Sequence, residues 1–388
     1  MVADPAVVAV SALPALATLP SVDSLTRVNV SGMTERLGAI LLATFAVVAL
    51  AAPTAAASLH VRGRHLVDHG RVVRLLGVNR SGTEYMCTDG YGDVFDGPHD
   101  QRSVSAMRSW RINAVRVPLN ESCWLGVGEL GRWARHYRRA VVRWVRLLRR
   151  NHLYVIVDDH VTAPGRGTAR DILPMPSAAQ TPRFWHSVGH TFRGTRDVLF
   201  DLYNEPHDVG WSCWLRGCRI APGVSPDSGM GYPSYRAAGM RRLLRAVRSG
   251  GARQPVMLAG IDWSLDLSQW LRRLPRGRQL VASLHTYGPA SDPNAAPCSS
   301  RCRGIVVRIA RRHPVVVGEL GEYDCAHGYI DDFMPWADRR GISYLGWTWD
   351  AVSPGGWQCG SGPSLIEDYD GTPTGFGVGF RDHLRRRR

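Results

Sequence analysis

The chain has 388 residues, of which 44% are hydrophobic and 21% charged, and this composition excludes an intrinsically disordered protein. The formal net charge is +15, and all 48 basic residues are arginines. Because the arginines are scattered along the chain, we interpret them as solvated surface residues and expect no nucleic-acid partner.

The N-terminal 57 residues are predicted to be a leader. Arg36 precedes an apolar run from Leu37 to Ala52, and the small residues of "APTAAAS" follow. This order is typical of a secretory signal peptide cleaved after Ala57, and the run is short for a membrane span. Met33 is a natural start, so residues 1–32 are interpreted as an over-extended gene start. We expect a secreted, extracellular protein that acts as a monomer, with no membrane insertion after cleavage.

The rest of the chain alternates short strand-like runs with longer amphipathic segments. Residues 59–75 predict a β-hairpin, turning at Asp68-His69-Gly70, that caps the bottom of the fold. Eight apolar or β-branched runs follow, over residues 72–79, 112–119, 154–159, 197–204, 255–260, 280–287, 314–321 and 343–350. Eight strand–helix units in about 290 residues predict a single (β/α)8 TIM barrel over residues 58–380. Residues 381–388 are predicted to be a basic tail.

The segments after several predicted strands are long, rich in Gly, Pro and Ser, and hold most of the eight cysteines. An even number of cysteines in a secreted protein favours disulfides, and the absence of any C-x-x-C motif makes zinc the weaker alternative. Spacing along the chain and adjacency of strands predict four bridges, namely Cys87–Cys123, Cys213–Cys218, Cys298–Cys302 and Cys325–Cys359.

Two carboxylates stand at the ends of the fourth and seventh predicted strands. Glu205 follows "VLFDLYN", and Glu319 lies in "PVVVGELG". In a regular barrel these two strand ends face each other across the C-terminal mouth, where active sites are built. A pair of opposed carboxyl groups is the equipment for glycoside hydrolysis, in which one group is protonated and the other ionised. This chemistry requires neither a metal nor a cofactor.

Other strand ends carry polar and aromatic groups. Arg116 is placed to bind an ionised carboxylate, and polar groups with indole faces suit a sugar cleft. Each has a structural alternative, because arginines form buried ion pairs and histidines and loop tryptophans are often packing residues. The remaining candidates at strand ends are His160, His285, Tyr287, Trp347 and Trp349, and a wider aromatic platform is expected from Trp124, Trp211, Trp214, Trp263 and Trp357.

Six motifs carry a family resemblance. They are "NAVRVP" (113–118), "VIVDDH" (155–160), "LYNEP" (202–206), "LHTYGP" (284–289), "PVVVGELG" (314–321) and "GWTWD" (346–350). In this order the set resembles glycoside hydrolase family 5, the cellulase family of retaining (β/α)8 enzymes, and in particular its secreted bacterial endoglucanases. The resemblance covers residues 59–375. One departure is Val161, where common members have an aromatic residue.

The resemblance implies a role for each matching residue. Glu205 would be the acid/base and Glu319 the nucleophile, oriented by Arg116 with Tyr287 beside it. The remaining assignments are Asn204 at the sugar 2-hydroxyl, His160 and His285 lining the −1 subsite, and Trp349 as its stacking floor.

We therefore expect a retaining endo-β-1,4-glucanase that hydrolyses β-1,4-glucan by double displacement, without a metal or cofactor. Alternatives of the same fold are a β-mannanase and an exo-β-glucosidase. An alternative of another class is a non-catalytic protein that binds polysaccharide or cell wall, against which the presence of both carboxylates argues.

Overall fold

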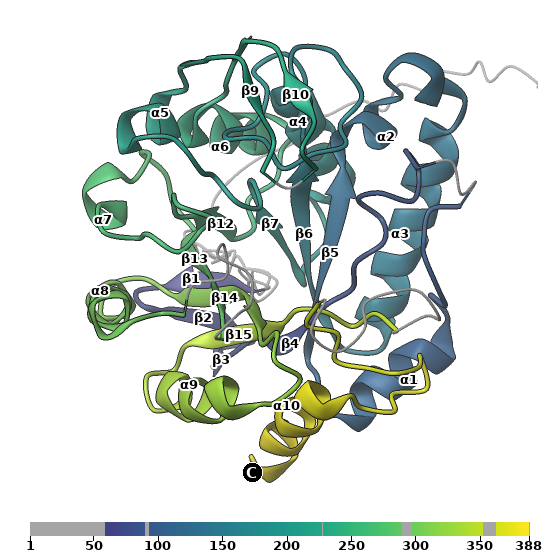
Figure 1. Ribbon diagram of the computed structural model, residues 1–388. Helices are drawn as coiled ribbons and strands as arrows, with labels where there is room; N and C mark the ends of the chain where they lie inside the picture. Colours follow the sequence, from purple (N-terminus) through teal and green to yellow (C-terminus); the bar gives the residue numbers. More distant parts are fainter. Residues whose placement is uncertain (1–58, 90–92, 227, 289–296, 352–361, 388) are drawn as a thin grey trace, which may run out of the picture. The chain divides into compact units, whose positions relative to one another are not determined.

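A computed structural model describes residues 59–89, 93–226, 228–288, 297–351 and 362–387. Within them, eight parallel strands close into a barrel in the order β12-β13-β14-β15-β4-β5-β6-β7 (Figure 1). This confirms the predicted (β/α)8 barrel. The barrel strands are β4 (Leu76–Asn79), β5 (Ala114–Asn120), β6 (Tyr154–Val161), β7 (Val198–Asp201), β12 (Val256–Ala259), β13 (Leu280–Tyr287), β14 (Val315–Gly321) and β15 (Ser343–Gly346).

Helices surround the barrel, and the long ones bury an apolar face (Figure 1). In α3, for example, Tyr137, Val141 and Leu148 are buried at helical spacing, while the arginines between them face outward. None of the described helices has the length and apolar character that a membrane span requires. The helices are α1 (Gln101–Ser109), α2 (Glu121–Leu125), η1 (Gly128–Arg132), α3 (Ala134–Arg150), α4 (Thr181–Phe192), α5 (Trp211–Arg216), α6 (Met240–Ser249), α7 (Trp270–Arg273), α8 (Ser300–Ala310), α9 (Gly328–Asp338) and α10 (Gly375–Arg386).

The predicted N-terminal hairpin is one strand larger than expected. An antiparallel sheet forms from β1 (His60–Arg62), β2 (His65–Asp68) and β3 (Arg71–Val73). His69 (φ 47°) and Gly70 (φ 79°) form the two-residue turn between β2 and β3, as the turn chemistry predicted. The predicted strand 72–79 is therefore divided between two sheets: β3 pairs with β2, and β4 pairs with β15. The sequence did not predict this division, because a continuous apolar run does not show where a chain leaves one sheet and joins another.

An apolar cluster closes the bottom of the barrel. Seven strands each place one residue there, and Leu75 adds an eighth directly before β4. Leu59 and Leu66 of the N-terminal segment are buried against this cluster, which confirms the predicted cap. The strand residues are Ala114, Ile156, Leu199, Met257, Val281, Val316 and Leu345.

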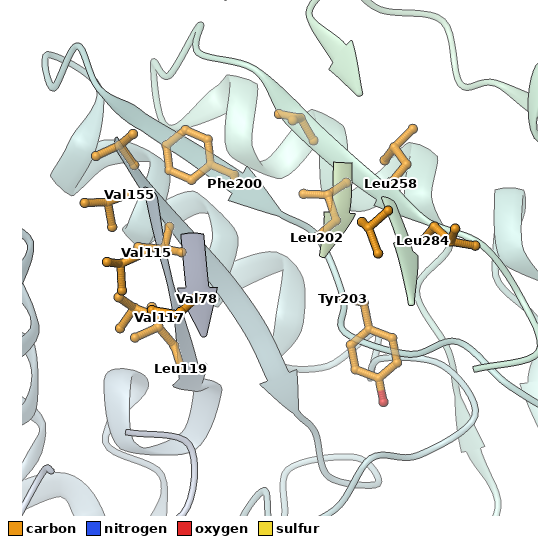
Figure 2. Packing of buried hydrophobic residues seen from close by; sticks show 14 of the residues in the cluster. Val78, Val115, Val117, Leu119, Val155, Phe200, Leu202, Tyr203, Leu258 and Leu284 are labelled. Atoms are coloured by element: carbon orange, nitrogen blue, oxygen red, sulfur yellow. The ribbon is translucent and has the colours of Figure 1, made fainter. Parts of the chain in front are cut away.

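The larger core lies between the strands and the helices. Val115, Val117 and Leu119 of β5 alternate with the residues that face the barrel axis, and they are fully buried (Figure 2). Phe200 of β7 and Leu258 of β12 belong to the same cluster. The two-residue period of each strand therefore assigns one set of side chains to the axis and the other to the helices.

Three of the four predicted disulfides are present, namely Cys87–Cys123, Cys213–Cys218 and Cys298–Cys302. Cys359, the predicted partner of Cys325, lies outside the described residues, as does the predicted leader, so both remain predictions. Between β7 and α6, short strands form two further antiparallel pairs, β8 (Arg219–Ile220) with β11 (Tyr235–Arg236) and β9 (Gly223–Val224) with β10 (Gly231–Tyr232).

The C-terminal segment differs from the basic tail expected over residues 381–388. Helix α10 continues to Arg386 and buries Phe380, His383 and Leu384. Arg387 also makes an ion pair with Asp338. The prediction weighed the arginines and overlooked the helical spacing of these three buried residues.

Candidate active site

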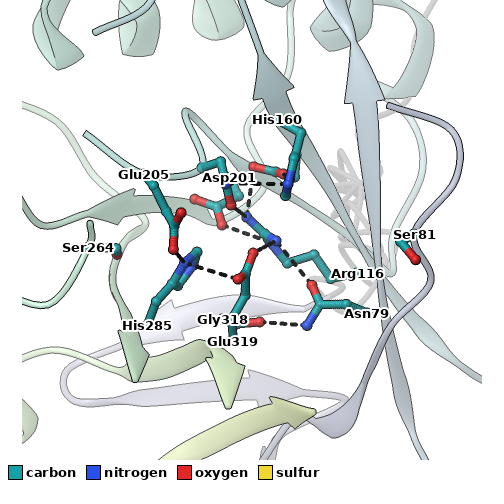
Figure 3. A network of polar contacts seen from close by, with 12 residues as sticks. Asn79, Ser81, Arg116, His160, Asp201, Glu205, Ser264, His285, Gly318 and Glu319 are labelled. Atoms are coloured by element: carbon teal, nitrogen blue, oxygen red, sulfur yellow. Dashed lines mark hydrogen bonds and ion pairs between the residues drawn. The ribbon is translucent and has the colours of Figure 1, made fainter. Parts of the chain in front are cut away.

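Arg116 lies at the centre of a polar network at the C-terminal end of the barrel (Figure 3). Its Nη1 is 2.8 Å from Glu319 Oε1, its Nη2 is 2.9 Å from Asp158 Oδ1, and its Nε is 3.1 Å from Asp201 Oδ2. Nη2 also donates to Asn204 Oδ1 at 2.8 Å. The arginine is fully buried. One guanidinium therefore holds three carboxylates and an amide in fixed positions.

Asn79, at the end of β4, fixes the other side of this network. Its Oδ1 accepts a hydrogen bond from Arg116 Nη1 at 3.0 Å, and its Nδ2 donates to the carbonyl oxygens of Gly318 (2.9 Å) and Gly346 (3.2 Å). Asn79 thus connects strands β5, β14 and β15. Sequence analysis did not select it, because a single asparagine after an apolar run carries no distinct signal.

Glu319 points into the barrel because β14 is irregular. Val316 faces the axis and Val317 faces the helices, so strict alternation would turn Glu319 toward the helices. Gly318 is skipped in the pairing of β13 with β14, so that Glu319 lies opposite His285. A Cβ at Gly318 would lie 2.9 Å from His285 Nε2, which explains the glycine. The bulge re-aims the carboxylate toward the network.

Glu205 approaches Glu319 from the opposite side, with His285 between them. His285 Nδ1 is 2.8 Å from Glu205 Oε1 and 3.5 Å from Glu319 Oε2. One carboxylate oxygen of each glutamate and a nitrogen of the histidine all lie within 4.8 Å of one another. The Glu205 side chain is 12% exposed and that of Glu319 is 4% exposed. The two predicted catalytic residues are therefore neighbours, and Glu205 is the more exposed of the two.

The hydrogen bonds around Glu319 suit an ionised carboxylate. The pKa of Glu319 is raised above its usual value because the effect of burial exceeds the opposing effect of the Arg116 guanidinium. Arg116 donates to one oxygen of Glu319 and the Tyr287 hydroxyl donates to the other, so both oxygens act as acceptors. Burial and the nearby Arg116 lower the pKa of His285 well below its usual value, so the imidazole is neutral.

The network holds more carboxylates than cations. Burial raises the pKa of Asp158 and of Asp201 to about 7 each, although Arg116 lowers both. In the described residues, no hydrogen bond reaches Asp201 Oδ1. Because three carboxylates face one guanidinium, protons are shared within the network near neutral pH.

His160 is held by its neighbours on both sides. Its Nδ1 is 2.7 Å from Asp158 Oδ2, and its Nε2 is 3.4 Å from Asn204 Nδ2. Donation from Nδ1 to Asp158 leaves Nε2 as an acceptor for the Asn204 amide. The imidazole also stacks on the Trp347 ring, with a centroid distance of 5.3 Å and an interplanar angle of 8°.

Trp349 does not present a ring face to this site. It is fully buried and packs edge-on against Trp110, with ring centroids 4.8 Å apart. Its burial argues against the predicted stacking floor. Trp347 is half-buried, and its ring stacks on that of His160 at the edge of the network. The family resemblance alone implied Trp349, and because β15 ends at Gly346 no strand period shows which of the two indoles is buried.

The wider aromatic platform is only partly present. Trp124, Trp211 and Trp214 are buried packing residues, and Trp357 lies outside the described residues. Trp263 is half-buried and stacks on His207 at 4.0 Å, with an interplanar angle of 2°. His207 had no predicted role.

Glu205, His285 and Glu319 are also close enough to hold a metal ion. Their chemistry favours another role. The Arg116 guanidinium already contacts Glu319 at 2.8 Å and opposes a second cation at the same carboxylate. His285 Nδ1, the nitrogen that faces both glutamates, contacts Glu205 at 2.8 Å. We assign no metal to these residues.

A family model described as cellulase (glycosyl hydrolase family 5) matches residues 76–353, a range that begins with β4 and ends beyond β15. The chain belongs to glycosyl hydrolase family 5. By its family it is a hydrolase of O-glycosidic bonds. The motif set that suggested this family from the sequence lies inside the matched range.

Relatives of this family 5 protein differ in their named substrates. A mannan endo-1,4-beta-mannosidase of Streptomyces lividans is 23% identical over 342 residues, which are 85% of this chain and 76% of the relative. The β-glucanase SdGluc5_26A of Saccharophagus degradans, solved with cellotetraose, has a TM-score of 0.59 at 17% identity, covering 85% of this chain and 93% of that one. The endoglucanase Cel5A (E5) of Thermobifida fusca has a TM-score of 0.57 at 17% identity, with coverages of 84% and 97%. These structural likenesses show the fold.

Proposed function

We propose that the protein is a retaining endo-β-1,4-glucanase. The observation that carries the proposal is the spacing of the two glutamates, whose nearest oxygens lie within 4.8 Å. Retaining glycosidases hold their carboxyl groups about 5–5.5 Å apart, whereas inverting enzymes leave about 6.5–9.5 Å for a water molecule. The spacing in this barrel leaves no room for that water.

The reaction proceeds by double displacement. Glu319 attacks the anomeric carbon, and Glu205 transfers its proton to the leaving oxygen as the glycosidic bond breaks. Glu205, now ionised, takes a proton from water, and the resulting oxygen nucleophile breaks the bond between the sugar and Glu319. Both glutamates return to their starting protonation states.

The neighbours of the two glutamates support these roles. Arg116 and Tyr287 donate to Glu319, which stabilises its ionised form and holds it for attack. Neutral His285 contacts Glu205 at 2.8 Å and orients it toward the leaving oxygen.

The same geometry suggests how the −1 sugar is held. Asn204 Oδ1 accepts from Arg116 and one Nδ2 hydrogen faces His160 Nε2, so the second Nδ2 hydrogen is the group that we assign to the sugar 2-hydroxyl. His160 and His285 border this position, and Trp347 offers the ring face on which a pyranose stacks. We assign the stacking role to Trp347 in place of Trp349.

The preference for glucan over mannan rests on the named neighbours. Two solved β-glucanases share the fold, whereas the mannosidase of Streptomyces lividans supports mannan as the second candidate. Glucose and mannose differ in the direction of the 2-hydroxyl, so the contact with Asn204 is where the two substrates diverge.

Hydrolysis of β-1,4-glucan and β-1,4-mannan oligosaccharides, followed by NMR, tests the proposal. We expect the β-anomer to appear first, and glucan to be cleaved internally and faster than mannan. First appearance of the α-anomer contradicts the retaining mechanism. Faster cleavage of mannan identifies the β-mannanase alternative, release of single glucose units identifies the exo-β-glucosidase, and no cleavage identifies the non-catalytic binding protein.

The cellular setting belongs to the same proposal. Three disulfides fit an oxidising, extracellular compartment and therefore a secreted enzyme acting on polysaccharide outside the cell. We further propose that it acts as a monomer, without nucleic acid and without a cofactor.

A further inference from the structure

The exposure of the tryptophans points to a second place where a sugar ring can stack. Two half-buried indoles, Trp263 and Trp347, belong to the candidate active site. Trp133 is 40% exposed and is the most exposed tryptophan in the described part of the chain, where every tryptophan except these three is buried. It lies between η1 and α3 and directly precedes α3, a helix on the outside of the barrel (Figure 1).

A cavity of about 200 Å³ opens beside Trp133. Its floor is apolar and buried, formed by Val94 and Tyr137. Its rim is polar and exposed, formed by Asp93, Arg132 and His136 together with the indole. A water molecule occupies about 30 Å³ in the liquid, so the cavity is several times larger than one water molecule. We compare it in size with a single sugar ring.

Hydrogen bonds and a disulfide hold the backbone around this cavity and the Tyr137 side chain. The Trp133 backbone donates to Leu130 O at 2.9 Å and accepts from Tyr137 N at 2.9 Å. The Tyr137 hydroxyl donates to Thr83 O at 2.8 Å and accepts from Asn120 N at 2.9 Å. The disulfide of Cys87, which lines the cavity, ties the β4–α1 segment to α2. A site built in this way loses little conformational freedom when a ligand binds.

We propose that this cavity, the Trp133 pocket, binds one unit of a β-1,4-linked polysaccharide outside the catalytic cleft. The indole face packs on the apolar face of a pyranose ring, while Asp93 and Arg132 bond its hydroxyls. One carboxylate and one guanidinium on the rim suit a neutral sugar rather than a polyanion. Neither Glu205 nor Glu319 is among the residues that line this cavity.

The ligand class rests on the proposed function, so the experiment separates the two. Binding to insoluble β-1,4-glucan and β-1,4-mannan is measured by depletion of free protein, at high salt, with Glu319→Gln as the parent to prevent hydrolysis. Trp133→Ala is compared with Val72→Ala, which truncates a 55% exposed side chain in the N-terminal sheet. Hydrolysis of soluble aryl β-cellobioside and aryl β-mannobioside is measured for the same substitutions with Glu319 intact.

We expect Trp133→Ala to weaken binding by about 2- to 10-fold, the range that loss of a ring stack implies, and Val72→Ala to leave it unchanged. Trp133→Phe should retain most of the binding, and kcat/KM on the aryl glycosides should not change. If Trp133→Ala binds the polysaccharide as tightly as its parent while hydrolysis is intact, the inference about the Trp133 pocket is wrong and the proposed function stands. Failure of the unmodified protein to hydrolyse either glycoside overturns the proposed function and the inference with it.

Discussion

The two ends of the same barrel strands have opposite chemistry. At the bottom, Ala114, Ile156 and Leu199 lie in an apolar cluster without a charged member. Two residues further along the same strands, Arg116, Asp158 and Asp201 form a buried ionic network, shown in part in Figure 3. Because side chains repeat every two residues along a strand, both layers face the barrel axis. Two residues along each strand separate the apolar cluster at the bottom from the ionic network of the candidate active site.

The two layers contribute to different properties of the protein, the lower one to stability and the upper one to the proposed chemistry. Burial of the lower layer stabilises the fold, because apolar surface leaves water. Burial of the upper layer opposes folding, because ions lose their hydration and three carboxylates share one guanidinium. The apolar cluster at the bottom and the core between strands and helices thus offset the unfavourable burial of the ionic network. Substitutions in the two layers should therefore change different measured quantities.

The largest effect is expected for Glu319→Gln. The substitution keeps the shape of the side chain and removes the nucleophile, so turnover of a soluble cellulose derivative should fall on the order of 10⁴-fold or more. Binding of an oligosaccharide, measured by calorimetry, should persist. The exposed Glu367→Gln serves as the control and should retain full activity. Turnover of Glu319→Gln within tenfold of the parent, about 1.4 kcal/mol in activation free energy, would remove Glu319 from its proposed role.

The second effect is expected for Arg116→Ala. Loss of the guanidinium leaves Asp158, Asp201 and Glu319 without their cation, and the free energy of unfolding should fall by about 3–5 kcal/mol. Arg149→Ala is the matched control, because Arg149 pairs with Asp197 at 3.2 Å on the surface, where both side chains are more than a quarter exposed. That control should change the free energy by about 0–1 kcal/mol in denaturant unfolding. Equal losses for the two variants contradict the central position of Arg116.

The third effect tests the bottom layer. Leu199→Ala opens a cavity in the apolar cluster and should lower the free energy of unfolding by about 2–5 kcal/mol. Because Leu199 lies two residues below Asp201, the folded fraction should still hydrolyse substrate at the normal rate. Denaturant unfolding and active-site titration give the two quantities separately. A large fall in kcat per folded molecule would show that the two layers are coupled.

Much of this molecule could be predicted from its sequence. The eight barrel strands were located because long apolar runs alternate with amphipathic helices at regular intervals. Glu205 and Glu319 were paired by counting strands, since opposite strand ends meet across a barrel mouth. Three disulfides followed from adjacency along the chain or in the barrel. These features depend on periodicity and order, which the sequence contains directly.

The features that escaped prediction depend on local departures from that periodicity. Alternation alone turns Glu319 away from the axis, and only the bulge at Gly318 corrects it. A glycine inside a strand is the available signal, although it does not show in which direction the next residue turns. Strand β15 ends at Gly346, so no strand period shows which of Trp347 and Trp349 is buried, and Trp349, which the resemblance implied, is the fully buried one.

Asp159 is a further departure from the pattern, and it leads to the smallest predicted effect. In β6, Val155 and Val157 face the helices, so alternation places Asp159 in the same apolar layer. Asp159 is fully buried, and within the described residues neither of its carboxylate oxygens has a hydrogen-bond partner. Burial, with the nearby carboxylates of Glu121 and Asp158, raises its pKa well above the usual value.

Asp159→Leu should therefore stabilise the protein, by about 1–3 kcal/mol at neutral pH. The folded-state pKa is raised, so the native protein holds a proton that the unfolded chain releases above about pH 4. The stability of the parent consequently falls as pH rises from there toward the folded-state pKa. The gain from Asp159→Leu should be small at about pH 4 and larger at pH 7, as measured by denaturant unfolding at both values. Asp159→Asn, which cannot ionise, should show the same trend with pH. A loss of stability at pH 7 in both variants would show that the ionised carboxylate is needed where it lies.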